Sequence, residues 1–433
     1  MALRFSGTAP QQAAVLAVDL PPRAQQLLGA GDLPGYGELF DRLAAVEDPQ
    51  RRYWAGIGML ERGLEASAQA NRGRVALLEL FAALADGALT MLEHEPREPK
   101  LLNYAGIALY ELWGLEGAEA LFKATRRLDP QLREAAGNLA EVRARKRLLH
   151  SARKRTPLHA AIPALTRRAL AVAERAQPAQ GLTLSLCMIV RDEQEMLPRC
   201  LAAVADAVDE IVVVDTGSRD ATIEIARSFG ARVIEREWTG SFADARNVSF
   251  DAATGDWVMY LDADEVLVRE DAPVLRALTG RTWREAFYLC ETNYTGVLDA
   301  GTAVTHNALR VFRNRPEYRF EGRLHEQIAN RLPGYLPERL EASPVRVEHY
   351  GYLGVVRDSR GKAQRNIELL RMQQRESAPT PFLHFNLGSE YAAAGDGPAA
   401  LAEFERAWSL LQSLADRDSY EFAPAIAAEV RFA

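Results

Sequence analysis

A change in hydrophobic periodicity near residue 182 is the feature that most limits how this chain can fold. Before it, apolar residues recur at helical spacing, whereas after it short β-rich runs alternate with helical segments until about residue 358. Continuous apolar strands between helices predict a mostly parallel sheet that is covered on both faces. The expected divisions are a helical repeat domain (1–150), a helix and linker (151–181), an α/β domain (182–357) and a second helical repeat segment (358–433).

Both helical regions carry the same pattern of small and aromatic residues. In each, a glycine precedes a small residue by 12 positions and an aromatic residue by 16. These residues are Gly106, Ala118 and Phe122 in the first region and Gly388, Ala400 and Phe404 in the second. The spacing resembles the tetratricopeptide repeat, in which small residues let two helices approach closely. Such repeats usually bind proteins or peptides on a concave surface; the alternative is that so few repeats brace the rest of the chain or form a homodimer contact.

Composition limits the class of protein. The length of 433 residues suggests roughly two or three domains, and the 48% hydrophobic and 26% charged residues are ordinary for a globular protein. The net charge of -7 argues against a nucleic-acid binder. Cys187, Cys200 and Cys290 have no metal-ligand spacing, which favours reduced thiols. We find no apolar run near the roughly 18 residues that span a bilayer and no signal peptide, so we expect a cytoplasmic protein without a transmembrane segment.

Carboxylates follow several of the predicted strands at the point where each strand ends. Asp192 and Glu193 follow the first strand, Asp215 ends the second, and Asp262 and Asp264 follow the run that starts at 257. The carboxyl ends of parallel strands face the ligand crevice of an open α/β sheet. Carboxylates there suit a hard divalent cation such as Mg²⁺ or Mn²⁺, which can also hold a diphosphate. The sequence therefore predicts a nucleotide and metal site at this edge.

The ordered set of motifs resembles the family-2 glycosyltransferases with the GT-A fold, a Rossmann-like α/β architecture. The resemblance covers roughly 182–355, and each motif alone is a weak signal. The motifs lie at 188–193, 210–222, 242–247, 255–257 and 262–264. The resemblance implies a nucleotide-sugar donor and a core of this fold between tetratricopeptide-like helical segments.

The resemblance also implies roles for individual residues. The donor-binding residues are Val190, Asp192, Glu193, Asp215, Gly217, Arg246, Asn247, Asp262, Ala263 and Arg310. Asp264 is the implied metal ligand. The residues leave alternatives open, since Asp215 could instead cap a helix or turn. Arg246 could instead pair with Asp244 or Asp251, and Glu193 could simply lie in a first helical turn.

Two later segments supply the candidates for acceptor chemistry. Transfer of a sugar requires a general base for the acceptor proton, and by resemblance Glu326 takes this role. The alternative is that Glu326 only supports His325 or Arg323. His349 is expected to bind the metal or the diphosphate, with a buried core histidine as its alternative, and Arg310 is expected to meet phosphate or sugar.

The resulting hypothesis is a metal-dependent, inverting glycosyltransferase that uses a nucleotide-sugar, with a UDP-sugar as the expected donor. The acceptor is a protein or peptide or a glycan, and a lipid-linked or cell-surface saccharide is the other class. Two rivals are a non-catalytic repeat scaffold with a decayed transferase domain and a nucleotidyltransferase. The second would carry a Gly-rich loop with a lysine after the first strand, where this chain has 190–193, Val-Arg-Asp-Glu.

Overall fold

The computed structural model describes residues 19–43, 46, 48–68, 74–149, 159–296, 302–334, 336–353, 359–414, 417 and 422–432. The chain divides into two compact units, one made mainly of residues up to Ala179 and the other mainly of residues from Gln180 onward. The predicted boundaries at 150/151 and 357/358 fall outside the described residues, so the predicted division at these points stays a prediction.

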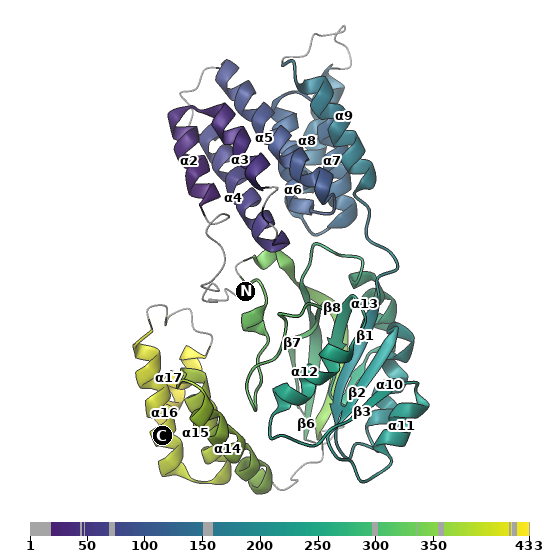
Figure 1. The fold of residues 1–433 in the computed structure, drawn as a ribbon, viewed down its shortest axis with the longest axis vertical. Coiled ribbons are helices and arrows are strands. Elements are labelled where there is room, and N and C mark those ends of the chain that lie inside the picture. Colours follow the sequence, from purple (N-terminus) through teal and green to yellow (C-terminus); the bar gives the residue numbers. More distant parts are fainter. Residues whose placement is uncertain are drawn as a thin grey trace. The chain divides into compact units, whose positions relative to one another are not determined.

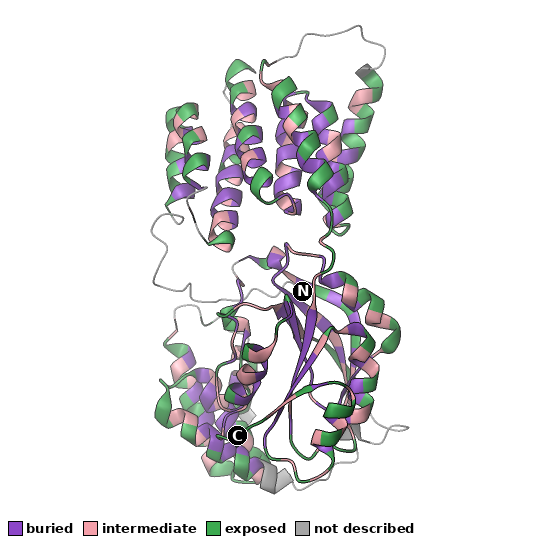
Figure 2. Cartoon of the chain, turned by 45° about the vertical axis from the view of Figure 1, so that its right-hand side comes forward, coloured by how far each residue is buried: buried purple, intermediate pink, exposed green. Residues whose placement is uncertain are grey.

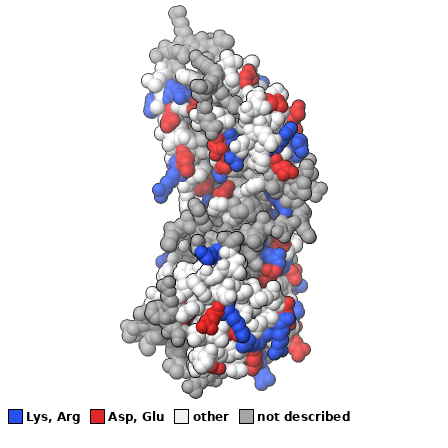
Figure 3. Space-filling model, turned by 90° about the vertical axis from the view of Figure 1, so that its left-hand side faces the viewer, with Lys and Arg blue, Asp and Glu red and all other residues white. Residues whose placement is uncertain are grey.

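The first unit is helical in its described part (Figure 1). Its helices are α2 (Leu20–Ala30), α3 (Leu33–Leu43), α4 (Pro49–Ala68), α5 (Arg74–His94), α6 (Pro99–Glu111), α7 (Leu115–Leu128), α8 (Arg133–Leu149) and α9 (Ile162–Arg175). Helix α9 lies in the stretch predicted as a helix and linker, and it packs against α5 and α7. On the face shown in Figure 3, acidic and basic side chains are interspersed over the described helices of this unit.

The glycine–aromatic spacing corresponds to direct contacts between paired helices. Gly106 of α6 lies against Phe122 of α7, so that an added Cβ would stand 2.5 Å from the ring. In the second unit, Gly388 lies in the same way against Phe404, again with 2.5 Å between an added Cβ and the ring. Any larger residue at either glycine would separate the two helices, which is the physical reason for the repeated pattern.

Helix α5 corrects one expectation from the sequence. By length and composition alone, its segment Val75–His94 is long and apolar enough to cross a membrane. The expectation that the sequence contains no apolar run of this length was therefore wrong. Core helices of soluble proteins meet the same criteria, and α5 packs against α3, α4, α6 and α9. Arg168 of α9 also pairs with Asp86 and Glu93 on this helix.

The second unit is built on an eight-stranded sheet with the order β3-β2-β1-β4-β7-β6-β8-β5. Its strands are β1 (Leu184–Val190), β2 (Glu210–Asp215), β3 (Arg232–Glu235), β4 (Trp257–Tyr260), β5 (Glu265–Leu267), β6 (Ala286–Gly296), β7 (Thr302–Arg313) and β8 (Leu340–Leu353). The neighbouring strands β3, β2, β1 and β4 run parallel to one another. They are the four strands that the sequence predicted, and their observed bounds agree with the predicted ones to within about one residue. The other half is mixed: β7 is antiparallel to β4 and β6, β8 is parallel to β6, and β5 is antiparallel to β8.

Helices and loops cover both faces of this sheet, as Figure 2 shows by its buried central strands. Alternate residues of β1 point to opposite faces, so that Leu186 and Met188 pack with α10 (Leu197–Val204), α11 (Thr222–Ser228) and α13 (Ala272–Leu278). Cys187 packs on the other face with α12 (Phe242–Ala252) and with the segment that follows β7. The predicted α/β core with helical flanks is confirmed.

Among the described residues, four α-helices follow the sheet in the same compact unit. They are α14 (Ser359–Glu376), α15 (Pro381–Ala394), α16 (Gly397–Gln412) and α17 (Ala423–Phe432). Leucines of α14 and α15 form a shared apolar cluster with Leu324, Trp238 and Phe242 of the α/β core. The second helical segment is therefore packed directly onto the part of the core that carries the 320–327 loop.

Candidate active site

The loops after β1 and β2 are hydrogen-bonded to each other at the carboxyl edge of the sheet. Val190 and Asp215 end these strands and lie opposite each other in parallel register. The N–H of Asp192 donates to the Ser218 hydroxyl at 2.9 Å. The N–H of Glu193 donates to the hydroxyl of Thr222, the first residue of α11, at 2.7 Å. With a φ of 55°, Asp192 adopts the left-handed conformation that aspartate tolerates better than most residues. The structure thus brings together the residues predicted to surround the nucleoside.

Asp215 is buried, and its carboxylate shapes the turn after β2. One oxygen accepts from the N–H groups of Gly217 and Ser218, both at 2.9 Å, and the other is hydrogen-bonded to the Ser218 hydroxyl. Gly217 has a φ of 106°, which favours glycine. Helix α11 has Ala221 at its N-cap, and Asp220 accepts from the N–H of Thr222 at 3.0 Å. The turn alternative for Asp215 is therefore observed and the helix-cap alternative is not. A carboxylate offers about four acceptor positions, which leaves Asp215 capacity for a ligand.

The turn between β4 and β5 directs Asp262 and Asp264 outward and their neighbours inward. The side chains of Asp262 and Asp264 are 44% and 31% exposed, whereas Ala263 and Glu265 are buried. Two hydrogen bonds of 3.0 Å close the turn, one from the N–H of Glu265 to the Asp262 carbonyl and one from the N–H of Asp262 to the Glu265 carboxylate. Both carboxylates are therefore partly open to solvent in a turn whose other side chains are buried.

His349 on β8 lies beside Asp264. Its Nε2 is 3.4 Å from an Asp264 carboxylate oxygen, and its Nδ1 is 2.5 Å from Oδ1 of Asn293 on β6. A Cβ at Gly351 would collide with the Asp264 carboxylate and would stand 2.9 Å from His349 Nε2, so glycine is needed at this close approach. Burial disfavours the charged imidazole, but the Asp264 and Glu291 carboxylates outweigh it and raise the pKa of His349 to about 10.

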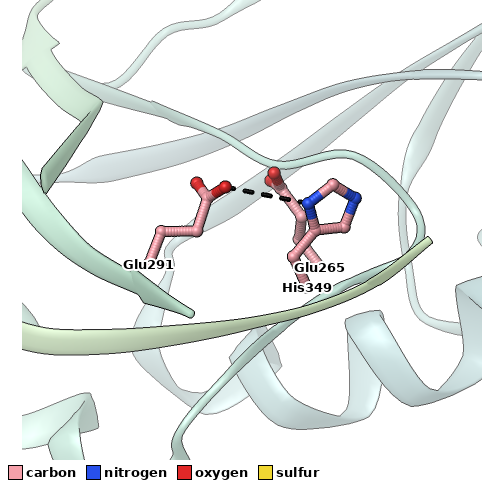
Figure 4. A group of neighbouring side chains, drawn as sticks. All are labelled: Glu265, Glu291 and His349. Atoms are coloured by element: carbon pink, nitrogen blue, oxygen red, sulfur yellow. Dashed lines mark ion pairs between the residues drawn. The ribbon is translucent and has the colours of Figure 1, made fainter. Parts of the chain in front are cut away.

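A buried charge network lies next to His349 (Figure 4). Oxygen and nitrogen atoms of Glu265, Glu291 and His349 lie within 4.8 Å of one another, a grouping that could hold a cation. Arg310 of β7 already neutralises the group, because its Nη2 donates to both Glu265 and Glu291. Burial raises the pKa of Glu265 to about 8 against the opposing effect of Arg310. In this structure Arg310 therefore lies in an internal ion-pair network, and its expected contact with phosphate or sugar stays a prediction.

Arg246 of α12 connects the two halves of the candidate site. Its Nη2 donates to Asp262 at 3.2 Å, and its Nε donates to Glu326 at 3.0 Å. The guanidinium is 6% exposed, lies near the Tyr260 and Phe320 rings, and its Nη1 is buried with no hydrogen-bond partner among the described residues. Burial opposes ionisation of Asp262, but Arg246 and the more distant charges outweigh it and lower the pKa of this carboxyl. The partners of Arg246 are thus the predicted site carboxylates instead of Asp244 or Asp251.

Asn247 supports the backbone of the following segment. Its Nδ2 donates to the Phe320 carbonyl at 2.9 Å, and its Oδ1 accepts from the Phe320 N–H at 2.8 Å. Both ends of the amide are therefore used within the protein. Asn247 therefore holds the start of the loop that carries Glu326. The sequence predicted a nucleotide contact for Asn247 and did not predict this structural role.

The matched motifs can now be compared with known proteins. Residues 185–322 match the family described as Glycosyl transferase family 2. This region is a family-2 glycosyltransferase domain. Asp215, Arg246, Asp262 and Asp264 lie inside the matched region, whereas Glu326 lies beyond its end.

The chain that contains this glycosyltransferase domain is also similar to individual curated proteins. A TPR repeat-containing protein of Synechococcus elongatus is 40% identical over 222 residues, which is 50% of this chain and 54% of the relative. The SPbeta prophage-derived glycosyltransferase SunS of Bacillus subtilis is 30% identical over 214 residues, 48% of this chain and 49% of the relative. The chain thus spans about half the length of these curated relatives. The crystal structure of S. aureus TarS can be aligned with 58% of this chain and 54% of the TarS chain, at 14% sequence identity and a TM-score of 0.36. At this level of similarity, no ligand or residue role of TarS is assigned to this chain.

Several contributors to the site of this domain were missed from the sequence. Glu291 and Asn293 lie on β6, which contains too many polar residues to form the apolar run that marks a buried strand. They meet His349 only because β6 and β8 pair in register. The one local signal is a glutamate inside a β-rich run, since a carboxylate that the fold buries requires a partner.

Proposed function

We propose that the chain is a metal-dependent, inverting glycosyltransferase that transfers a sugar from a UDP-sugar to a hydroxyl or other nucleophile of an acceptor. The observation that carries the proposal is the link through Arg246. One buried guanidinium binds Asp262, on the predicted donor side, and Glu326, the predicted base. Donor and acceptor groups are therefore held in one connected site, as a single displacement requires.

The nucleoside is proposed to bind at the joined loops after β1 and β2. Asp215 ends its strand at the carboxyl edge and keeps acceptor capacity toward a uracil N–H or a ribose hydroxyl. Asp192 and Glu193 lie on the neighbouring loop, and the Asp192 carboxylate also accepts from the Arg219 N–H at 2.7 Å. This cross-connection supports a preformed pocket wall at the end of the sheet.

Asp264 and His349 fit the requirements of a divalent cation. A carboxylate oxygen and an imidazole nitrogen lie 3.4 Å apart, and both approach Gly351 so closely that a Cβ at this position would not fit. A bound Mn²⁺ or Mg²⁺ would neutralise the charge that develops on the leaving diphosphate. Asp262, which is half-exposed in the same turn, would contact the ribose or water bound at the cation.

In the proposed transfer step, the bond between the anomeric carbon and the diphosphate oxygen breaks, and its electron pair leaves with UDP. An acceptor oxygen forms the new bond to the anomeric carbon from the opposite side. Glu326 takes the proton from this oxygen. Arg246 orients the Glu326 carboxylate through its 3.0 Å hydrogen bond.

The acceptor class is proposed from the repeat-like helices. A second helical segment packs on the loop of Glu326, so an acceptor bound there would lie close to the base. Helical repeats of this kind favour a protein or peptide acceptor. A cytoplasmic location stays a prediction.

Hydrolysis of UDP-sugars tests the proposal without knowledge of the acceptor, because water can replace it. We would measure UDP release from UDP-glucose, UDP-galactose and UDP-N-acetylglucosamine with Mn²⁺, with Mg²⁺ and with EDTA, together with binding of UDP. The proposal predicts turnover that depends on the metal. A wild-type protein that neither binds UDP nor hydrolyses any of these donors would instead be the non-catalytic scaffold.

A further inference from the structure

The loop that carries Glu326 is closed and conformationally constrained. The N–H of Glu321 donates to the Gln327 carbonyl at 3.0 Å, and the N–H of Gln327 donates back to Glu321 at 2.9 Å. Within the loop, Gly322 has a φ of 100° and His325 a φ of 52°. A histidine in the left-handed region is uncommon and persists only when its surroundings hold it there.

One side of this loop is held by the α/β core. Asn247 binds both backbone groups of Phe320, and the N–H of Phe242 donates to the Arg323 carbonyl at 2.9 Å. Arg323 also reaches back to the turn before α12, since its Nη1 donates to the carbonyl of Gly240 at 2.9 Å. These contacts fix the start and the middle of the loop.

The other side is held by the C-terminal helices. Arg323 donates two hydrogen bonds, both of 2.7 Å, to the Glu376 carboxylate at the end of α14, and its N–H donates to Gln373 at 2.7 Å. Leu324 is buried in the leucine cluster of α14 and α15. His325, which precedes Glu326, has its Nε2 3.6 Å from the Glu390 carboxylate of α15. Three consecutive residues before Glu326 therefore contact the C-terminal helices.

We propose that helices α14 and α15 belong to the acceptor side of the site and that Arg323 is a positioning residue for Glu326. The inference rests on the proposed function, because it takes Glu326 as the base. Arg323 lies three positions before Glu326 and binds the α/β core and α14 at once. Loss of its contacts would let the loop move relative to Arg246, which fixes the other end of the Glu326 side chain.

The first test replaces Arg323 by glutamine and follows hydrolysis of UDP-glucose with Mn²⁺. Displacement of a base by about 1 Å lowers the rate on the order of 100-fold, so we expect kcat to fall by about 10- to 100-fold. The KM and the affinity for UDP with Mn²⁺ should stay near those of wild type, because the contacts of Arg323 do not include the donor loops or Asp264. Arg323→Lys should restore only part of kcat, since lysine cannot form the bidentate pair.

Two further variants separate positioning from folding. Glu376→Gln leaves Arg323 in place and removes the charge of its partner, so kcat should fall in the same direction by a smaller factor. Arg269→Gln breaks the exposed pair with Asp206 in the same unit and should leave kcat unchanged. Exposed pairs contribute little to global stability, so Arg269→Gln should keep the wild-type melting temperature. The kcat values are compared at a temperature at which the melting curve of each variant shows it to be folded.

A double-mutant cycle with Glu326→Gln decides the mechanism. If Arg323 acts through Glu326, then Arg323→Gln should lower kcat little further once Glu326 is replaced. Multiplicative effects of the two changes, or a wild-type kcat in folded Arg323→Gln, would overturn the inference. An inactive wild type that does not bind UDP would instead contradict the proposed function.

Discussion

Nε2 of His349 lies 3.4 Å from a carboxylate oxygen of Asp264, and both side chains approach Gly351 too closely for a Cβ to fit there. The carboxylate comes from the turn before β5, whereas the imidazole comes from β8, which pairs with β5 in antiparallel register. The proposed metal site therefore depends on a sheet pairing between segments that are far apart in the sequence.

Replacement of Glu326 by glutamine should separate donor binding from transfer. Glutamine keeps the size and one oxygen that can accept from Arg246, but it cannot take a proton. We expect hydrolysis of UDP-glucose to fall by on the order of 100-fold or more, because a general base typically contributes about 10²–10⁴-fold. Binding of UDP with Mn²⁺, measured by calorimetry, should be retained. Unchanged hydrolysis would remove Glu326 from the role of base.

Replacement of Gly351 by alanine should weaken the proposed metal site. The new methyl group would push against the Asp264 carboxylate and His349 Nε2, which must separate or rotate. We expect at least a tenfold loss of Mn²⁺-dependent UDP affinity. Gly397→Ala is the matched control, because an added Cβ there meets no described atom within 4 Å. Equal UDP affinities in the two variants would show that Gly351 does not shape the site.

Stability of the metal-free protein should depend on pH through His349. Its pKa is raised to about 10 in the folded protein, compared with about 6.5 in an unfolded chain. The contacts with Asp264 and Glu291 therefore stabilise the protein fully below about pH 6.5, and this contribution is lost as the pH rises through about 10. Urea unfolding in EDTA at several pH values should show this decline in wild type and a smaller decline in His349→Gln. Equal declines would contradict the assignment.

The sequence predicted the local features of the site better than its distant contacts. Asp215, Asp262 and Asp264 follow apolar strands, and strand ends can be recognised within a few residues. The register that brings Asn293 and Glu291 to His349 has no local signature, because β6 and β8 are separated by the whole of β7 and a long connection. Arg310 shows the same limit: it was named as a site candidate by resemblance, but its two buried glutamate partners come from other strands.

The contribution of the C-terminal helices was also beyond the reach of the sequence pattern. The glycine and aromatic spacing predicted how α15 and α16 pack together, and Gly388 does lie against Phe404. It did not indicate where the helix pair would attach. Arg323 and Leu324 provide that attachment through single side chains that carry no periodic signal.

Binding of UDP to wild type and to Asp264→Asn, with and without Mn²⁺, tests the central claim most directly. Asparagine preserves the shape of Asp264 but removes the charge that would hold the cation beside His349. Calorimetry should show Mn²⁺-dependent UDP binding by wild type, a loss of at least tenfold in Asp264→Asn, and weak binding by both proteins in EDTA. UDP affinity that is the same in both proteins and unaffected by Mn²⁺ would contradict a metal-dependent nucleotide-sugar site at this position.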